Sequence, residues 1–141
     1  MKKAIALLLA LVMVFALCAC GGGDKGTADN GEKVVKIGVF EPASGDSGAG
    51  GKKEMLGMQY ANQETPTVEI GGETYKVELV YSDNGSDSAK AVSAASKLVN
   101  EKVSLVLGSY GSGVSIAASD TFKQAGIPAI GVTCTNPNVT A

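Results

Sequence analysis

The fold of this 141-residue chain is decided by the stretch Val103-Ser104-Leu105-Val106-Leu107-Gly108-Ser109-Tyr110-Gly111-Ser112-Gly113. Its first six residues are mostly apolar and predict a short buried strand. Glycines and serines then form a turn, after which a helix is expected with an apolar face made of Val114, Ala117, Ala118, Phe122 and Ala125. A strand, a glycine-rich turn and a helix in this order are typical of an α/β protein with a parallel sheet.

The same alternation extends to both sides of this stretch. Further strands are expected over residues 34–40, 77–81 and 127–132, and further helices over residues 52–63 and 88–102. Gly71-Gly72 predicts the turn of a β-hairpin that leads into the strand at 77–81, and Asp87 or Ser86 is suited to cap the helix that follows. Together these elements predict an open parallel sheet with helices on both faces.

Four loops are expected at the carboxyl edge of this sheet, where open α/β sheets bind their ligands. They cover residues 41–51, 82–87, 109–113 and 133–137, and they are rich in hydroxyls, glycines and amides. The loop at 109–113 precedes a helix N-terminus, where free N–H groups and the helix dipole favour an anion. Ser112 adds a hydroxyl donor, and the lack of a lysine in the loop favours a carboxylate over a diphosphate. Alternatively, the glycines serve only the turn and the serines cap the helix.

The loop at 133–137 is the second candidate site. Its hydroxyls and carbonyls suit an ammonium group as well as a carboxylate, although an ordinary Asn136-Pro137 turn explains the same residues. Asp83 stands in another of the four loops, and Glu41 is the nearest candidate for a second carboxylate. We expect Asp83 to cap a helix or to form loop hydrogen bonds rather than to bind a metal or accept a phosphate.

The N-terminus has the order of a secretory signal peptide: Met1-Lys2-Lys3 is positively charged, residues 4–17 are apolar, and small residues precede Cys20. The apolar run of fourteen residues is shorter than the roughly 20 that a spanning helix needs. Leu17-Cys18-Ala19-Cys20 resembles the lipobox of bacterial lipoproteins. The resemblance implies cleavage before Cys20, a lipid on its sulfur, and a protein anchored at the outer face of the cell membrane. In an ordinary secretory signal, the alternative, Cys20 would be incidental.

Three regions follow from this organisation. Residues 1–19 are expected to be the lipoprotein signal peptide, and residues 20–33 to be the lipidated Cys20 with a disordered, glycine-rich tether. Residues 34–141 are long enough for one small domain.

The composition excludes several classes of function. The chain has neither histidine nor arginine, so all twelve of its basic residues are lysines and the commonest general base and metal ligand is missing. Cys134 is left without a disulfide partner and without a histidine to activate it, so we expect it to be buried as a small apolar side chain. The sequence contains no cluster of basic residues of the kind that would indicate nucleic-acid binding. The sequence therefore predicts a protein that is not an enzyme and that needs no cofactor or metal.

A series of short motifs runs from residue 36 to the last residue: Ile37-Gly38-Val39, Ser44-Gly45, Gly57-Met58-Gln59, residues 77–83, Ala91-Val92, Lys97-Leu98-Val99, Val106-Leu107-Gly108, Ser112, Gly126-Ile127-Pro128 and residues 133–137. In this order they resemble the branched-chain amino-acid substrate-binding proteins of ABC transporters, which have the type I periplasmic-binding fold. The resemblance implies that residues 34–141 are the first lobe of a two-lobed clamp that closes on an amino acid and presents it to a membrane permease.

The resemblance also implies roles for single residues. Ser112 matches the serine that binds the α-carboxylate of the ligand, Thr133 the residue whose carbonyl meets the α-ammonium group, and Thr135 the threonine that contacts both. Tyr110 and Ser44, in two of the same loops, complete the expected set of ligand-binding residues. The implied function is a lipid-anchored, extracytoplasmic receptor for a branched-chain or related amino acid. A regulatory module that senses an amino acid or amide is the alternative, because receptors of that kind share the fold.

The sequence departs from the family in two respects. Gly50 and Gly51 stand where family members often carry an aromatic residue that covers the ligand. The second lobe is also missing from the chain, which implies an incomplete first lobe with an open sheet edge and exposed apolar surface. We therefore expect the chain to be a fragment of a longer protein.

Overall fold

The computed structural model describes residues 32–141. The expected signal peptide, Cys20 and nearly all of the expected tether lie outside the described residues. The elements run in the order β1 (Val34–Val39), α2 (Gly48–Glu64), β2 (Thr67–Ile70), β3 (Glu73–Tyr81), α3 (Ser88–Asn100), β4 (Leu105–Leu107), α4 (Ser112–Ala125), β5 (Ala129–Ile130) and the 3-10 helix η1 (Pro137–Thr140). Within this part of the chain, every helix is too short or too polar to cross a membrane.

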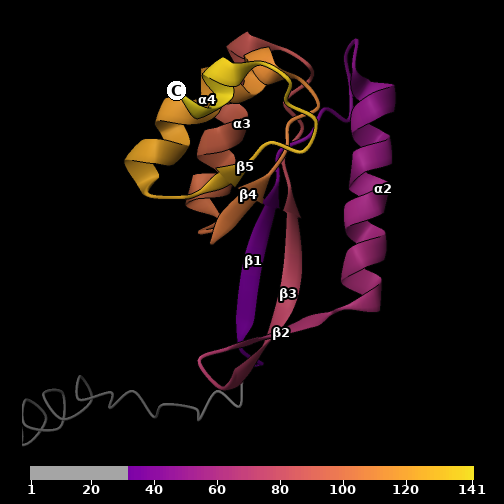
Figure 1. Cartoon of the computed structure of the whole chain (residues 1–141), viewed down its shortest axis with the longest axis vertical. Helices are drawn as coiled ribbons and strands as arrows, with labels where there is room; N and C mark the ends of the chain where they lie inside the picture. Colours follow the sequence, from indigo (N-terminus) through magenta and orange to yellow (C-terminus); the bar gives the residue numbers. More distant parts are fainter. Residues whose placement is uncertain (1–31) are drawn as a thin grey trace, which may run out of the picture. The chain divides into compact units, whose positions relative to one another are not determined.

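The strands form one sheet in the order β2-β3-β1-β4-β5. β1 pairs in parallel with β3 and with β4, and β4 pairs in parallel with β5. β2 is antiparallel to β3, as the Gly71-Gly72 hairpin predicts. Helix α2 lies on one side of the sheet, and α3 and α4 lie on the other (Figure 1). The predicted open sheet with helices on both faces is therefore confirmed.

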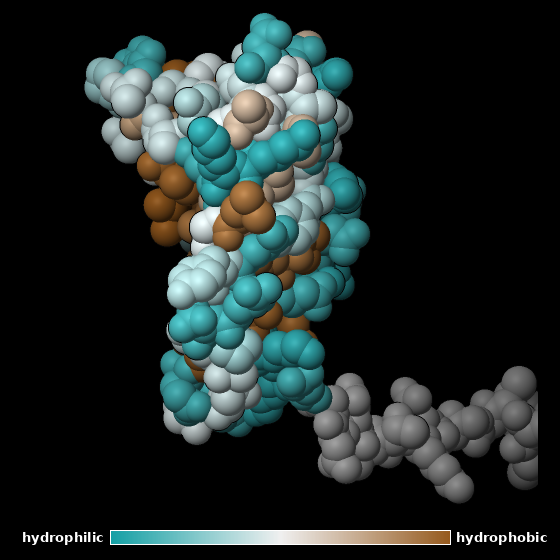
Figure 2. Space-filling view, turned by 90° about the vertical axis from the view of Figure 1, so that its right-hand side faces the viewer, coloured by the Kyte–Doolittle hydropathy of each residue, from teal (hydrophilic) through white to brown (hydrophobic). Residues whose placement is uncertain are grey.

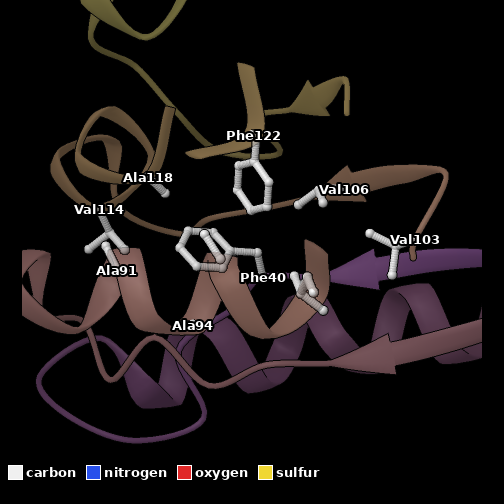
Figure 3. Packing of buried hydrophobic residues seen from close by; sticks show 10 residues of the cluster. Phe40, Ala91, Ala94, Val103, Val106, Val114, Ala118 and Phe122 are labelled. Carbon is white, nitrogen blue, oxygen red and sulfur yellow. The ribbon is translucent and has the colours of Figure 1, made fainter. Parts of the chain in front are cut away.

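The core lies between the sheet and the pair of helices α3 and α4 (Figure 3). Phe40, just after β1, meets Phe122 of α4 edge to face, with ring centroids 5.5 Å apart and planes at 87°. The alanines expected to form the stripe of α3 are buried beside them. A Cβ on Gly38 of β1 would lie 3.0 Å from Val106 and 3.1 Å from Leu98, so glycine lets α3 pack closely on the sheet.

The opposite face of the sheet is only partly covered by α2. A cavity of about 700 Å³ separates them, lined by apolar side chains that include Val35, Ile37, Leu79, Leu105, Met58 and Ala61. Leu56 and Tyr60 of α2 are 63% and 65% exposed. Hydrophobic patches interrupt the mostly hydrophilic surface on this side of the molecule (Figure 2). The exposed apolar surface expected of an incomplete lobe is thus confirmed.

Two predicted boundaries and one residue predicted to be buried are wrong. Helix α2 begins at Gly48 rather than residue 52, so the glycines taken for loop form its first turn. They are needed there, because a Cβ on Gly51 would lie 2.2 Å from the carbonyl oxygen of Pro42. β5 keeps only two of the six expected residues, because its partner β4 has only three. Ala125 is exposed, since it is the last residue of α4 and lies beyond the buried Phe122.

Candidate functional site

The candidate site lies at the carboxyl edge of the sheet, where strand order changes direction. The chain leaves β1 for β3 on one side and later returns to β4 on the other. Between β1 and β4 the loops that follow these strands diverge, and open α/β sheets bind ligands at such a point. The loops at residues 40–47 and 108–111 flank it, and the loop at 131–136 lies beside the second of them.

Tyr110, in the loop after β4, contacts both the segment after β1 and the first turn of α2. Its backbone N–H donates to Glu41 Oε2 at 2.8 Å. Its ring lies against the first turn of α2, since a Cβ on Gly50 would be only 2.5 Å from the ring atom Cζ. The ring is 42% exposed at the edge of the site. An aromatic ring from the loop after β4 thus lies beside the first turn of α2, and Gly50 makes room for it.

Ser112 and Thr135 are brought together as the sequence predicts. Ser112 Oγ accepts hydrogen bonds from the backbone N–H groups of Thr135 at 3.1 Å and Asn136 at 3.2 Å. Because both bonds use the oxygen as acceptor, the Ser112 hydroxyl proton remains available to a ligand. The side chains of Thr133 and Thr135 are exposed.

The N-terminus of α4 differs from that of α3. Asp87 caps α3, with its carboxylate accepting from the N–H of Ala89 at 2.8 Å. The N-cap of α4 is Gly111, and no side chain caps the helix there. The alternative in which the loop serines cap α4 is therefore wrong. The first N–H groups of α4, together with the dipole, leave a place for a carboxylate from outside the chain.

Ser44 links the loop after β1 to the loop after β3. Its hydroxyl donates to Asp83 Oδ2 at 2.7 Å, and Asp83 Oδ1 accepts from the N–H groups of Ala43 and Gly85, both at 2.8 Å. Partial burial acts to raise the pKa of Asp83, but these hydrogen bonds outweigh it and lower the pKa. Asp83 is thus a loop-bracing carboxylate, as predicted.

Asn84 is a buried residue of the site that sequence reasoning missed. It is fully buried, and its Nδ2 donates to the Phe40 carbonyl at 3.1 Å and to Ser109 Oγ at 3.0 Å, while Oδ1 accepts from the N–H of Ser86. It therefore ties the loops after β1, β3 and β4 together. An asparagine before glycine is so typical of an ordinary turn that no local signal marks this role.

Cys134 is half-buried rather than fully buried as predicted. Its Sγ donates to the Ser109 carbonyl at 3.3 Å and lies 3.2 Å from Ser115 Oγ. These polar contacts place the thiol beneath the two candidate ligand loops and join them. Its role in the described structure is to position the loop at 131–136.

Glu41 carries the largest electrostatic perturbation at the site. The residue is 1% exposed. Burial raises the pKa of its carboxyl to about 8, and the neighbouring carboxyl of Glu54 acts in the same direction, against the lowering effect of the Tyr110 N–H. Across residues 32–141 no three acidic or cysteine side chains gather to hold a metal ion. The polar groups left facing the edge are suited to binding a small charged molecule.

Comparison with known proteins decides the family. The profile of the periplasmic binding protein family matches residues 34–141. The chain belongs to this family. Leu/Ile/Val-binding protein homolog 2 of Brucella abortus is 34% identical over 129 residues, which are 92% of this chain and 33% of that protein. The chain thus spans about a third of the length of the curated relatives it matches.

Two solved structures of the family resemble the described domain. A leucine-binding protein, LivK, from Thermotoga maritima is 36% identical, with a TM-score of 0.69 over 76% of this chain and 30% of its own. The branched-chain amino acid transporter substrate-binding protein LivJ of Streptococcus pneumoniae, in complex with isoleucine, is 34% identical, with a TM-score of 0.67 over 77% of this chain and 31% of its own. These relatives are binding proteins and not enzymes, which confirms both the resemblance seen in the motifs and the non-enzymatic prediction.

Proposed function

We propose that residues 34–141 form the first lobe of a receptor that binds a branched-chain or related amino acid for import by an ABC transporter. The observation that carries the proposal is the uncapped N-terminus of α4 beside the Ser112 hydroxyl. The α-carboxylate of the ligand would accept from Ser112 and from the first N–H groups of α4. The carbonyl of Thr133 and the hydroxyl of Thr135 would meet the α-ammonium group, with Tyr110 covering the ligand from the side of α2.

The relatives support this choice of ligand by their names, since they include a leucine-binding protein and a protein crystallised with isoleucine. The mode of capture follows from the fold. A site between loops at one edge of a lobe becomes closed only when a second lobe covers it, so the ligand-bound clamp would be the form that a permease recognises. A lipid on Cys20 would keep this receptor close to its permease. Growth of the producing cells with a labelled fatty acid tests the lipid: the wild-type protein should become labelled, and Cys20→Ala should not.

Ligand binding is tested by thermal shift and calorimetry on the full chain with L-leucine and L-isoleucine. A ligand that binds the native state raises Tm by mass action. Loss of a hydrogen bond to a charged group costs about 1.5–3 kcal/mol, so Ser112→Ala should weaken binding roughly 10- to 150-fold.

Ser119→Ala is the matched control, because Ser119 lies on the same helix and bonds only to the Ile116 carbonyl. It should bind as the wild type does. If neither amino acid binds the wild type, or if both variants bind alike, the proposed role of the α4 N-terminus is refuted.

A further inference from the structure

Glu41 stands at the junction of three segments of the site. Its Oε2 accepts from the Tyr110 N–H, as described above, while its Oε1 has no hydrogen-bond donor among residues 32–141. A Cβ on Gly108 would lie 2.6 Å from that oxygen, so the carboxyl is pressed against the loop after β4. A buried carboxylate oxygen without a donor is costly and needs an explanation.

Glu54 of α2 supplies the explanation. Both of its carboxyl oxygens are buried and also lack a donor among the described residues. Its carboxyl lies close enough to that of Glu41 to raise the pKa of the Glu41 carboxyl. Two neighbouring carboxyl groups can satisfy each other by a hydrogen bond only when one of them carries a proton, because an ionised carboxylate is purely an acceptor. Two adjacent carboxylates also repel each other, which favours keeping one proton between them.

No cation compensates this pair in the described part of the chain. The ion pairs there join Lys33 to Glu73, Lys36 to Glu101 and Lys76 to Glu32. From the loop after β3, Asp83 accepts hydrogen bonds from the N–H groups of Ala43 and Gly85 and from the Ser44 hydroxyl, so its carboxylate is already satisfied by other donors. The loop after β4 contributes Tyr110, which offers its N–H, and the loop after β5 contributes Cys134, which bonds to the Ser109 carbonyl. Glu54 is therefore the charged partner that Glu41 meets.

We propose that Glu41 and Glu54 share one proton, and that the protonated pair positions Tyr110 in the ligand site by joining α2, the end of β1 and the loop after β4. When the proton leaves, two negative charges face each other and α2 is pushed away from the loop. The Tyr110 ring, which rests on Gly50 of the same helix, then loses its support. Glu41 and Glu54 are thus positioning residues, and ligand affinity should fall as the pair ionises. Only this last step rests on the proposed function.

The shared proton is tested without a ligand by a ¹³C NMR titration of the full chain labelled at the glutamate carboxyls. In the wild type, one glutamate resonance should titrate near pH 8, far above ordinary glutamates, and the Tyr110 amide should shift at the same midpoint. In Glu54→Gln the amide group can donate to Glu41 and the second carboxylate is gone, so this titration should move to lower pH, although the burial of Glu41 remains. Glu64→Gln, at the exposed end of the same helix, should leave it in place. Titration of every glutamate below pH 6 in the wild type, or an unchanged titration in Glu54→Gln, would overturn the proposal.

The positioning role is tested by calorimetry with L-leucine and L-isoleucine between pH 6 and pH 9. Wild-type affinity should fall about tenfold between pH 7 and pH 9, whereas Glu54→Gln should lose far less. Dividing the wild-type affinity by the Glu54→Gln affinity at each pH cancels the effect of the ligand's own titration. A wild type and a Glu54→Gln with the same pH profile would overturn the positioning role even if the shared proton is found. Absence of binding in every variant, with the NMR result intact, would refute the proposed function and leave the shared proton standing.

Discussion

Replacing Asn84 should destabilise the protein more than any single loop substitution of comparable size. Asn84→Ala leaves the Phe40 carbonyl and the Ser86 N–H without their partner, whereas Ser109 Oγ still accepts from the Gly111 N–H. Each buried polar group left unpaired costs about 1–3 kcal/mol. The free energy of unfolding should therefore fall by about 4 kcal/mol, a large part of the roughly 5–15 kcal/mol typical of a domain.

Asn84→Asp sharpens the same prediction, because it keeps the shape and removes the donor. At pH 7 its carboxylate would face the Phe40 carbonyl and Ser109 Oγ without the two N–H bonds that Asn84 makes, so the loss should exceed that of Asn84→Ala. Protonation restores one donor, and burial raises the pKa of the new carboxyl. Stability lost at pH 7 should therefore return as the pH falls towards 5.

Urea unfolding followed by circular dichroism measures both changes. Asn100→Ala is the control, because Asn100 is exposed at the end of α3, and it should shift the free energy of unfolding by less than about 0.5 kcal/mol. The reasoning would be refuted if Asn84→Ala lay within about 1 kcal/mol of the wild type. It would also be refuted if Asn84→Asp were no less stable than Asn84→Ala at pH 7.

Two further predictions concern helix α2 and the buried acid. Gly57 has no neighbour within 4 Å of an added Cβ, so Gly57→Ala should raise the free energy of unfolding by about 0.5–1 kcal/mol. Gly51→Ala should lower it, because the new methyl group meets the Pro42 carbonyl. Urea unfolding of the two variants measures both changes. The second is a pH profile. Because the pKa of Glu41 is raised from 4.5 to about 8, its contribution to stability is fully present below pH 4.5 and is lost as the pH rises through 8. The free energy of unfolding should fall by up to about 1.4 kcal/mol per pH unit across this window. Melting temperatures from pH 4.5 to 9 should show this slope in the wild type and a flatter profile in Glu41→Gln; parallel profiles would contradict it.

The fold was largely predictable because its signals are local. Apolar runs such as residues 34–40 mark the strands, and the alanine stripe of α3 marks the face that is buried. The start of α2 was not predictable, because Gly50 and Gly51 are poor helix formers that are placed there by contacts with Tyr110 and Pro42.

The contacts of the candidate site also include some that could be predicted from the sequence and some that could not. The meeting of Ser112 and Thr135 follows from strand order, since both stand in the segments that follow the carboxyl ends of neighbouring parallel strands. The Glu41–Glu54 pair and the three bonds of Asn84 depend on side-chain directions in folded space. No spacing in the sequence marks them, because the partners come from different elements and each residue type is ordinary at its position.

The loose fit of α2 over the sheet has a consequence for native-state hydrogen exchange. A helix that lies above a cavity of about 700 Å³ loses little buried contact when it detaches, whereas α3 and α4 share the core with Phe40 and Phe122. The amides of α2 should therefore exchange through a local opening, at a lower free energy than those of α3. This same cooperative unit carries Gly50 and Glu54, so a ligand held under Tyr110 should slow exchange along the whole of α2, including turns that never touch it.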